Sequence, residues 1–308
     1  MVAMAAGPGW AEGVRRLLRK FTSFRQPGSS LPDCLPLVVG EEAVGLVPPA
    51  VARELSGFPE VFSVWEEAPG RGCVRLSEAL TSCAPRTAAV ARVLAELRAR
   101  DTFPALALWR DELYEVKLRF GDPPLLHVER AATPLLGLVQ YGAHLNGYVL
   151  RDGELFMWLA RRSLSKTTYP GLLDNLAAGG ISSGLGVKET LIKECWEEAR
   201  IHPELAAQAL PTGCISYAYE DKLKGVVREC LFVFDLEMPA DFVPTVGDGE
   251  VQEFYLWPID KVREAVSSTN FKPNCALVVL DFLLRHGLLE PDHEPLYVEL
   301  VSGLHQVP

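Results

Sequence analysis

The spacing of apolar residues divides the chain into two parts near residues 121–130. Before this point, short helical and strand patterns follow one another without a long regular stretch. The elements predicted there are a helical stripe at 10–21, a helix at 49–56, a strand at 61–65 and a helix at 87–99. The run Gly121-Asp122-Pro123-Pro124 supplies turn residues that are typical of a boundary. We therefore expect two domains, at residues 1–125 and 126–308.

Beyond the boundary, the apolar pattern predicts strands that are interleaved with helices. Residues 145–150 and 155–160 are joined by Arg151-Asp152-Gly153, which indicates a hairpin. The other elements expected are a helix at about 187–199, strands at 212–219, 226–236 and 254–257, and helices at 258–266 and 274–286. This order predicts an α/β (mixed α+β) fold. A mixed sheet is sandwiched between helices and is preceded by a smaller α+β N-terminal domain.

Composition limits the classes of partner. The formal net charge of -10 disfavours nucleic acid and anionic membranes, because both attract basic surfaces. No apolar run approaches the roughly 20 residues that a membrane-spanning helix needs. The seven cysteines are scattered and form no Cys-x-x-Cys pair. We therefore expect reduced thiols in a cytosol-like compartment, without zinc or disulfides.

The first 25 residues have two interpretations. They contain five basic residues against one acid, Glu12, and the apolar positions from Trp10 to Phe21 share one helical face. A mitochondrial transit peptide has this character, and so does the first helix of a folded domain. We favour the helix, and we expect a cytoplasmic protein with a mitochondrial location as the alternative.

Three glutamates on one predicted helix are the main candidates for chemistry. Glu194, Glu197 and Glu198 stand three and four positions apart, so the helical period places them on one face. A hard divalent cation such as Mg²⁺ or Mn²⁺ relieves their repulsion, because these ions prefer carboxylate oxygens. Gly179 and Gly180 precede the helix and allow backbone amides to approach a phosphate. A solvated charged face is the ordinary alternative, and the upstream glycines favour the metal site.

The same residues resemble the Nudix box, the signature of a family of pyrophosphohydrolases. Counting from Gly179, the three glutamates fall on the helix glutamates of the box, and Lys193 stands where the box has arginine. Leu185 replaces the first glutamate of the box, and Arg200 replaces its closing glycine. Glu189 lies in the first turn of the predicted helix and is a candidate to replace part of the missing acid. The resemblance implies the Nudix fold and metal-dependent hydrolysis of a diphosphate.

A longer stretch, at about 105–290, resembles the Nudix branch that is fused to thiamine pyrophosphokinase in some fungi. The matching segments are residues 141–148, 173–180, 193–199, 248–251 and 271–276. This resemblance implies that the first third is the amino-terminal extension of that branch. It also implies hydrolysis of thiamine diphosphate, or of its damaged oxo and oxy forms, to the monophosphate. The expected partner is a small-molecule diphosphate, without nucleic acid or membrane, and a homodimer stays open.

The expected roles divide among metal binding, catalysis and substrate binding. Glu194, Glu197 and Glu198 are expected to hold Mg²⁺ (or Mn²⁺), and Glu197 and Glu198 are also candidates for the base that activates water. Nudix enzymes commonly take a further acid from a late loop, where Glu250 is the candidate and Glu253 the second choice. The candidate substrate-binding residues are Gly179, Gly180, Lys166, Arg161 and Tyr148, and Lys193 and Glu189 are expected to support the motif.

Two other functions stay open. One is a Nudix hydrolase of a different substrate, such as a nucleoside diphosphate derivative. The other is a binding module that has the fold without turnover, and the departures at Leu185 and Lys193 motivate it. For single residues, an exposed turn carboxylate is the ordinary alternative for Glu250, and core packing is the more frequent fate of Tyr148.

Overall fold

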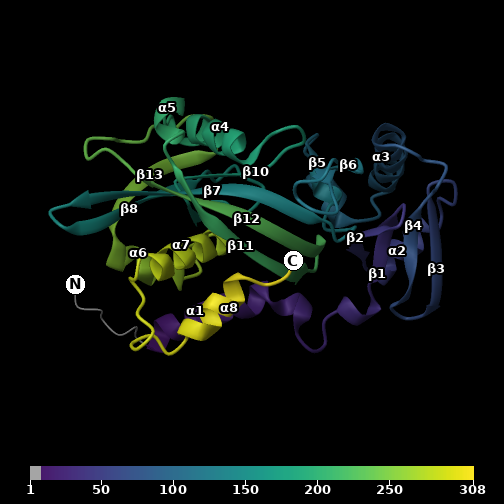
Figure 1. Ribbon diagram of the computed structural model, residues 1–308, viewed down its shortest axis with the longest axis horizontal. Helices are drawn as coiled ribbons and strands as arrows, with labels where there is room; N and C mark the ends of the chain where they lie inside the picture. Colours follow the sequence, from purple (N-terminus) through teal and green to yellow (C-terminus); the bar gives the residue numbers. More distant parts are fainter. Residues whose placement is uncertain (1–7) are drawn as a thin grey trace.

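The computed structural model describes residues 8–308, and Figure 1 shows a small N-terminal part beside a larger sheet covered by helices. The fold is mixed α/β, as the sequence predicts. Predictions that concern residues 1–7 lie outside the described residues. Within residues 8–308, no helix is long and apolar enough to cross a membrane.

The N-terminal part is built on a four-stranded sheet in the order β2-β1-β4-β3. These strands are β1 (Leu35–Val39), β2 (Glu42–Val47), β3 (Phe62–Ala68) and β4 (Arg71–Leu76), and β1 pairs with β4 in parallel. The helices α2 (Pro49–Leu55) and α3 (Cys83–Ala99) confirm the predicted helices. The buried face of α3 carries Val90, Val93, Leu94 and Leu97, the apolar stripe expected of a helix that packs on one side.

A short hairpin connects this part to the rest of the chain. It pairs β5 (Leu113–Val116) with β6 (Leu126–Glu129). The predicted boundary falls beside this hairpin, yet Leu126, Val128 and the leucines up to Leu138 pack in the same apolar cluster as α3. The N-terminal core therefore extends beyond residue 125, and a division there stays a prediction.

The larger sheet has the order β11-β12-β7-β8-β13, with β10 paired to β7 and β9 paired to β8. Its strands are β7 (Val139–Arg151), β8 (Glu154–Arg162), β9 (Leu173–Asp174), β10 (Ala177–Gly180), β11 (Leu210–Asp221), β12 (Gly225–Glu237) and β13 (Val251–Pro258). The pairing of β12 with β7 is parallel, and the other pairings are antiparallel. The sheet is mixed, as predicted.

Helices cover both faces of this sheet (Figure 1). One apolar cluster joins α4 (Val187–Ala199) to one face, beside α5 (Pro203–Ala206). The other cluster joins α6 (Ile259–Val266), α7 (Pro273–Arg285) and α8 (Tyr297–Leu304) to the opposite face. Burial on both faces explains the runs of apolar residues in the central strands, such as Cys230–Phe234 of β12.

The first helix packs on the larger sheet and not on its sequence neighbours. α1 (Pro8–Phe21) buries Trp10, Val14, Leu18 and Phe21 in the cluster of α7 and α8. The Trp10 Nε1 donates a hydrogen bond of 2.8 Å to the carbonyl of Arg263. The interpretation of this segment as a folded helix is therefore confirmed for the described residues, and the helix belongs to the core of the C-terminal domain.

Candidate active site

A cavity of about 400 Å³ lies where segments of both domains meet. Among the residues that the structure describes, seven cationic and seven acidic side chains line it. The cationic ones are Arg110, Arg130, Arg162, Lys166, Lys193, Lys224 and Lys272, and the acidic ones are Glu112, Glu194, Glu197, Glu198, Glu229, Asp248 and Glu250. In a chain of net charge -10, this lining carries as many cationic as acidic side chains. It offers groups for an anionic ligand and for a metal ion together.

The glycine strand β10 leaves room for side chains from two directions. A Cβ at Gly179 would lie 2.5 Å from Cγ of Glu194, and nearer still to its carboxyl carbon. A Cβ at Gly180 would collide with the phenol of Tyr114 in the N-terminal domain. At both positions the carboxylate or the phenol takes the space of a side chain, so any residue other than glycine would displace it.

The helix α4 places its glutamates along the cavity. Glu198 is buried, and its Oε2 accepts a hydrogen bond of 2.9 Å from the amide of Ala178 in β10. Burial, and then the nearby carboxylates of Asp174 and Glu194, raise the pKa of Glu198 well above its usual value. Burial also raises the pKa of Glu194. Both carboxyls are therefore placed where a bound cation would favour their charged form.

Lys193 connects two of the glutamates. Its Nζ lies 2.6 Å from Oε2 of Glu197 and 3.2 Å from Oε1 of Glu194. Burial lowers the pKa of this lysine, but the two carboxylates outweigh that effect and raise it. The ammonium of Lys193 thus neutralises two carboxylates that would otherwise be free to hold a metal ion.

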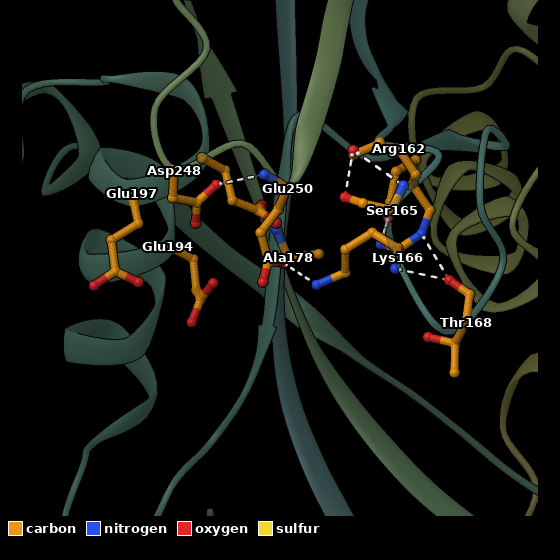
Figure 2. A network of polar contacts seen from close by, with 12 residues as sticks. Arg162, Ser165, Lys166, Thr168, Ala178, Glu194, Glu197, Asp248 and Glu250 are labelled. Carbon is orange, nitrogen blue, oxygen red and sulfur yellow. Dashed lines mark hydrogen bonds and ion pairs between the residues drawn. The ribbon is translucent and has the colours of Figure 1, made fainter. Parts of the chain in front are cut away.

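The turn before β13 brings a further acid to the same cavity. The amide of Gly247 donates a hydrogen bond of 3.1 Å to the carbonyl of Glu198. This bond holds the turn against the end of α4. Glu250 then lies at the cavity, with its Oε2 2.5 Å from Nζ of Lys166. Figure 2 shows Glu194 and Glu197 on one side of the site, Lys166 on the other, and Glu250 between them. Glu253 does not line the cavity and bonds to Tyr255.

The donor set is suited to a hard cation in its chemistry. Carboxylate oxygens are the ligands that Mg²⁺ and Mn²⁺ prefer, and the cavity supplies them from Glu194, Glu197, Glu198 and Glu250. Within residues 8–308, no three acidic, histidine or cysteine side chains converge as a ready metal site. Glu194, Glu197 and Glu250 are instead paired with lysines. An ion bound there would replace these ammonium groups.

Two arginines of the N-terminal domain form a cationic wall of the cavity, and sequence reasoning missed both. Arg130 Nη1 lies 2.9 Å from Oε2 of Glu112. The other carboxylate oxygen of Glu112 accepts a hydrogen bond of 2.6 Å from the hydroxyl of Ser182. Burial lowers the pKa of Arg130, but Tyr114 and Glu112 outweigh burial and raise this pKa above its usual value. The guanidinium therefore stays charged. Arg110 lines the cavity beside it. These residues carry no periodic or motif signal, because only the docking of the domains brings them to the site.

A buried ion group supports the floor of the cavity. Asp174 pairs with Nη1 of Arg162 at 2.7 Å and with Nζ of Lys272 at 3.1 Å. Burial raises the pKa of Asp174, but the two cations outweigh it and hold this pKa well below its usual value. Behind the group, Nδ1 of His144 lies 2.9 Å from Oδ1 of Asn175, so His144 is a buried structural residue.

Two predicted substrate-binding residues lie elsewhere. Tyr148 packs against the rings of Phe282 and His286 and does not line the cavity, so the expected substrate contact is corrected to core packing. Arg161 donates to Tyr255 and to the carbonyl of Gly171 instead of reaching the cavity. Arg162 lines the cavity, and its neighbour Arg161 points to the opposite face of β8 because successive side chains of a strand alternate.

Glu189 supports α4 without replacing an acid of the site. Its Oε2 accepts a bond of 3.4 Å from the amide of Gly186, which is the residue before the helix. This contact caps the helix, and Glu189 does not line the cavity. By contrast, Gly179, Gly180 and Lys166 line it as expected.

Known proteins match both parts of the chain. Residues 16–140 match the model of a domain of unknown function (DUF4743), and residues 145–275 match that of the NUDIX domain. The chain is similar to Nudix hydrolase 24, chloroplastic, of Arabidopsis thaliana, with 43% identity over 89% of this chain and 73% of the relative. Nudix hydrolase 20, chloroplastic, of the same plant is 40% identical over 92% and 76%. The uncharacterized protein YJR142W of Saccharomyces cerevisiae is 39% identical over 64% and 61%.

Proposed function

Because the chain belongs to the Nudix hydrolase family, a class of pyrophosphohydrolases, we propose that it is a Mg²⁺-dependent enzyme (or Mn²⁺-dependent) that cleaves thiamine diphosphate or its oxidised analogues. The products are the monophosphate and phosphate. One observation carries the reaction type. The glutamates of α4 and the guanidinium groups of Arg110 and Arg130 line the same cavity, so it offers ligands for a cation and cations for a diphosphate within one space. The thiamine part rests on the resemblance of residues 105–290 to the thiamine-related branch.

In this proposal, Glu194, Glu197 and Glu198 hold the metal ion. When bound, Mg²⁺ lowers the pKa of water and shields the phosphate charge. Glu250 accepts the proton of the attacking water, since its carboxylate is partly exposed and faces the cavity. The water oxygen forms a bond to phosphorus and the P–O–P linkage breaks, so the leaving phosphate departs with the bridging oxygen.

The cationic side chains of the cavity would bind the negative charge of the phosphate oxygens during this step. Arg110 and Arg130 approach from the N-terminal domain, and Lys166 approaches from the loop after β8. A guanidinium binds phosphate oxygens in a planar, two-point manner, which also orients the substrate. Gly179 and Gly180 leave room over β10 for Glu194 and Tyr114, so a side chain at either glycine would displace one of these two residues.

A substrate screen tests the proposal. Thiamine diphosphate, its oxo and oxy analogues and nucleoside diphosphate derivatives are compared with Mg²⁺ by kcat/KM. We expect the highest value for a thiamine-type diphosphate, and losses of about 100-fold or more in Glu197→Gln and Glu198→Gln. Glu204→Gln is the matched control, because Glu204 is exposed on α5 outside the cavity.

Two outcomes would replace the proposal. A higher kcat/KM for a nucleoside derivative would assign the enzyme a different substrate. Metal binding without turnover of any diphosphate would favour a binding module, which the lysine pairing of Glu194 and Glu197 motivates. Full activity in both glutamine variants would show that the metal site lies elsewhere.

We propose a cytoplasmic location, with a mitochondrial one as the alternative. The packing of α1 into the folded core supports the first, because Trp10 and Phe21 are buried there. The two plant relatives are chloroplastic by name. A homodimer stays a prediction that measurement of the mass in solution would test.

A further inference from the structure

Three aromatic rings that line the cavity also flank one ammonium group, that of Lys20, which is exposed and is not itself a lining residue. The Nζ of Lys20 lies 5.7 Å, 5.5 Å and 5.6 Å from the ring centroids of Phe21, Tyr169 and Tyr219. It also donates a bond of 3.3 Å to the hydroxyl of Tyr169. All three rings line the cavity that holds the α4 glutamates. We call Phe21, Tyr169 and Tyr219 the aromatic cage.

The cage is assembled from distant segments, and one of them is held in an unfavourable conformation. Phe21 comes from α1, Tyr219 from β11, and their ring centroids are 5.1 Å apart. Tyr169 has a φ of 52°, a left-handed conformation that is uncommon for a large side chain. Arg162 donates to the carbonyls of Thr168 and Tyr169 and holds the loop in place. Strain of this kind gathers at binding sites, where the surrounding structure stabilises it.

A carboxylate lies on the strand beside the cage. Glu229 of β12 lines the cavity, stands opposite Tyr217 of β11 and accepts a hydrogen bond from the hydroxyl of that tyrosine. Tyr219 is two residues further along β11, on the same face. Aromatic faces and a carboxylate both attract a cation and offer nothing to an anion. The chemistry of this corner therefore differs from that of the arginine wall.

We infer that the aromatic cage is the subsite for a positively charged organic group of the substrate, such as a cationic heteroaromatic ring, and that Lys20 occupies it until the substrate displaces it. This inference rests on the proposed function for the diphosphate end of the ligand. Tyr219 of the cage is on β11 and the glycine strand is β10, with β12 and β7 between these two strands. Three strand spacings separate them by about 14 Å, so one ligand that reaches both is elongated.

Binding of unphosphorylated thiamine to the full chain without metal tests the cage alone. Thiamine carries the cationic ring and lacks the diphosphate, and thiochrome is its neutral, oxidised counterpart. We expect thiamine to bind more tightly than thiochrome. Tyr169→Leu and Tyr219→Leu should each weaken thiamine binding by about tenfold, as the loss of a desolvated cation–π contact does. Tyr169→Phe keeps the ring and should retain most of the affinity.

The lysine supplies a second, opposite readout. Lys20→Met removes the internal cation and should tighten thiamine binding several-fold. Lys261→Met is the matched control, because Nζ of Lys261 lies 3.9 Å from the ring centroid of Trp257, which does not line the cavity. This control should leave thiamine binding unchanged. Melting temperatures of all variants show that the changes arise in folded protein.

The outcomes separate the cage from the proposed function. Equal affinity for thiamine and thiochrome, or weaker thiamine binding in Lys20→Met, would overturn the cage. Hydrolysis of thiamine diphosphate with an unchanged KM in Tyr169→Leu and Tyr219→Leu would also overturn it, while the proposed function would stand. Thiamine binding that depends on the rings, in a protein that hydrolyses no diphosphate, would support the cage and refute the proposed function.

Discussion

Replacing Gly179 by alanine should disable the metal site while leaving the fold intact. The new Cβ would lie 2.5 Å from Cγ of Glu194, where an ordinary contact begins at 3.4 Å. The Cγ atom must therefore withdraw by about 0.9 Å, the difference between these distances, and the carboxyl carbon, which lies nearer to the new Cβ, must withdraw by more. Since Mg²⁺ requires oxygens at about 2.0–2.1 Å in near-octahedral geometry, a shift of this size removes Glu194 as a ligand.

The magnitudes differ for stability and for catalysis. The atoms that must move are the end of a flexible side chain, so the free energy of unfolding should fall by only about 1 kcal/mol, the lower end of overpacking costs. A displacement near 1 Å at a reacting centre costs about 100-fold in kcat/KM. The stabilisation by Mg²⁺, about 2.7 kcal/mol at 100 times its Kd, should shrink as Kd rises.

Two assays check the expectation. Thermal unfolding with and without Mg²⁺ reports metal binding, and a Mg²⁺ titration of kcat/KM with thiamine diphosphate reports turnover. Gly121→Ala is the control, because the same methyl group at that position meets open space. A Gly179→Ala variant with the wild-type response to Mg²⁺ in both assays would refute the assignment of Glu194 as a ligand.

Three further changes test the buried groups around the site. Burial and Lys272 lower the pKa of His144 from 6.5 to about 4, so its contribution to stability is present above pH 6.5 and is lost as pH falls towards 4. In His144→Gln, the free energy of unfolding should therefore fall by up to about 3 kcal/mol less between pH 6.5 and pH 4 than in the wild type. An unchanged slope of this free energy against pH would contradict the burial argument. Arg162→Met breaks a buried pair with Asp174 and should cost about 3 kcal/mol in chemical denaturation. Arg130→Lys keeps the charge but loses the planar guanidinium, so it should raise KM about tenfold with little change in Tm, and an unchanged KM would exclude it from phosphate binding.

Much of the fold follows from local sequence patterns. The predicted helix at 187–199 coincides with α4, and the predicted strand pairs lie inside β7, β8, β11 and β12. These elements are long and periodic, so the spacing of their apolar residues indicates whether one face or both faces are buried. The short strands β9 and β10 were not predicted, because two to four residues carry no readable period.

The candidate site divides in the same way. The spacing of Glu194, Glu197 and Glu198 determined that they share one helix face, and Gly179 stood at the expected distance before them. The type and sequence position of Tyr148 and Arg161 also suggested them as contacts, yet neither lines the cavity. The direction of a side chain depends on strand pairing and register, which a single strand does not reveal.

Only the tertiary structure decided which distant segments complete the site. Arg110 and Arg130 reach the cavity through the docking of the N-terminal domain, and Phe21 reaches it because α1 crosses to pack on the larger sheet. Between Phe21 and Tyr219 lie 197 intervening residues, so no local signal relates them. Local interactions choose helices and strands, whereas burial of the remaining apolar faces chooses their neighbours, and a site at a domain junction depends on that second choice.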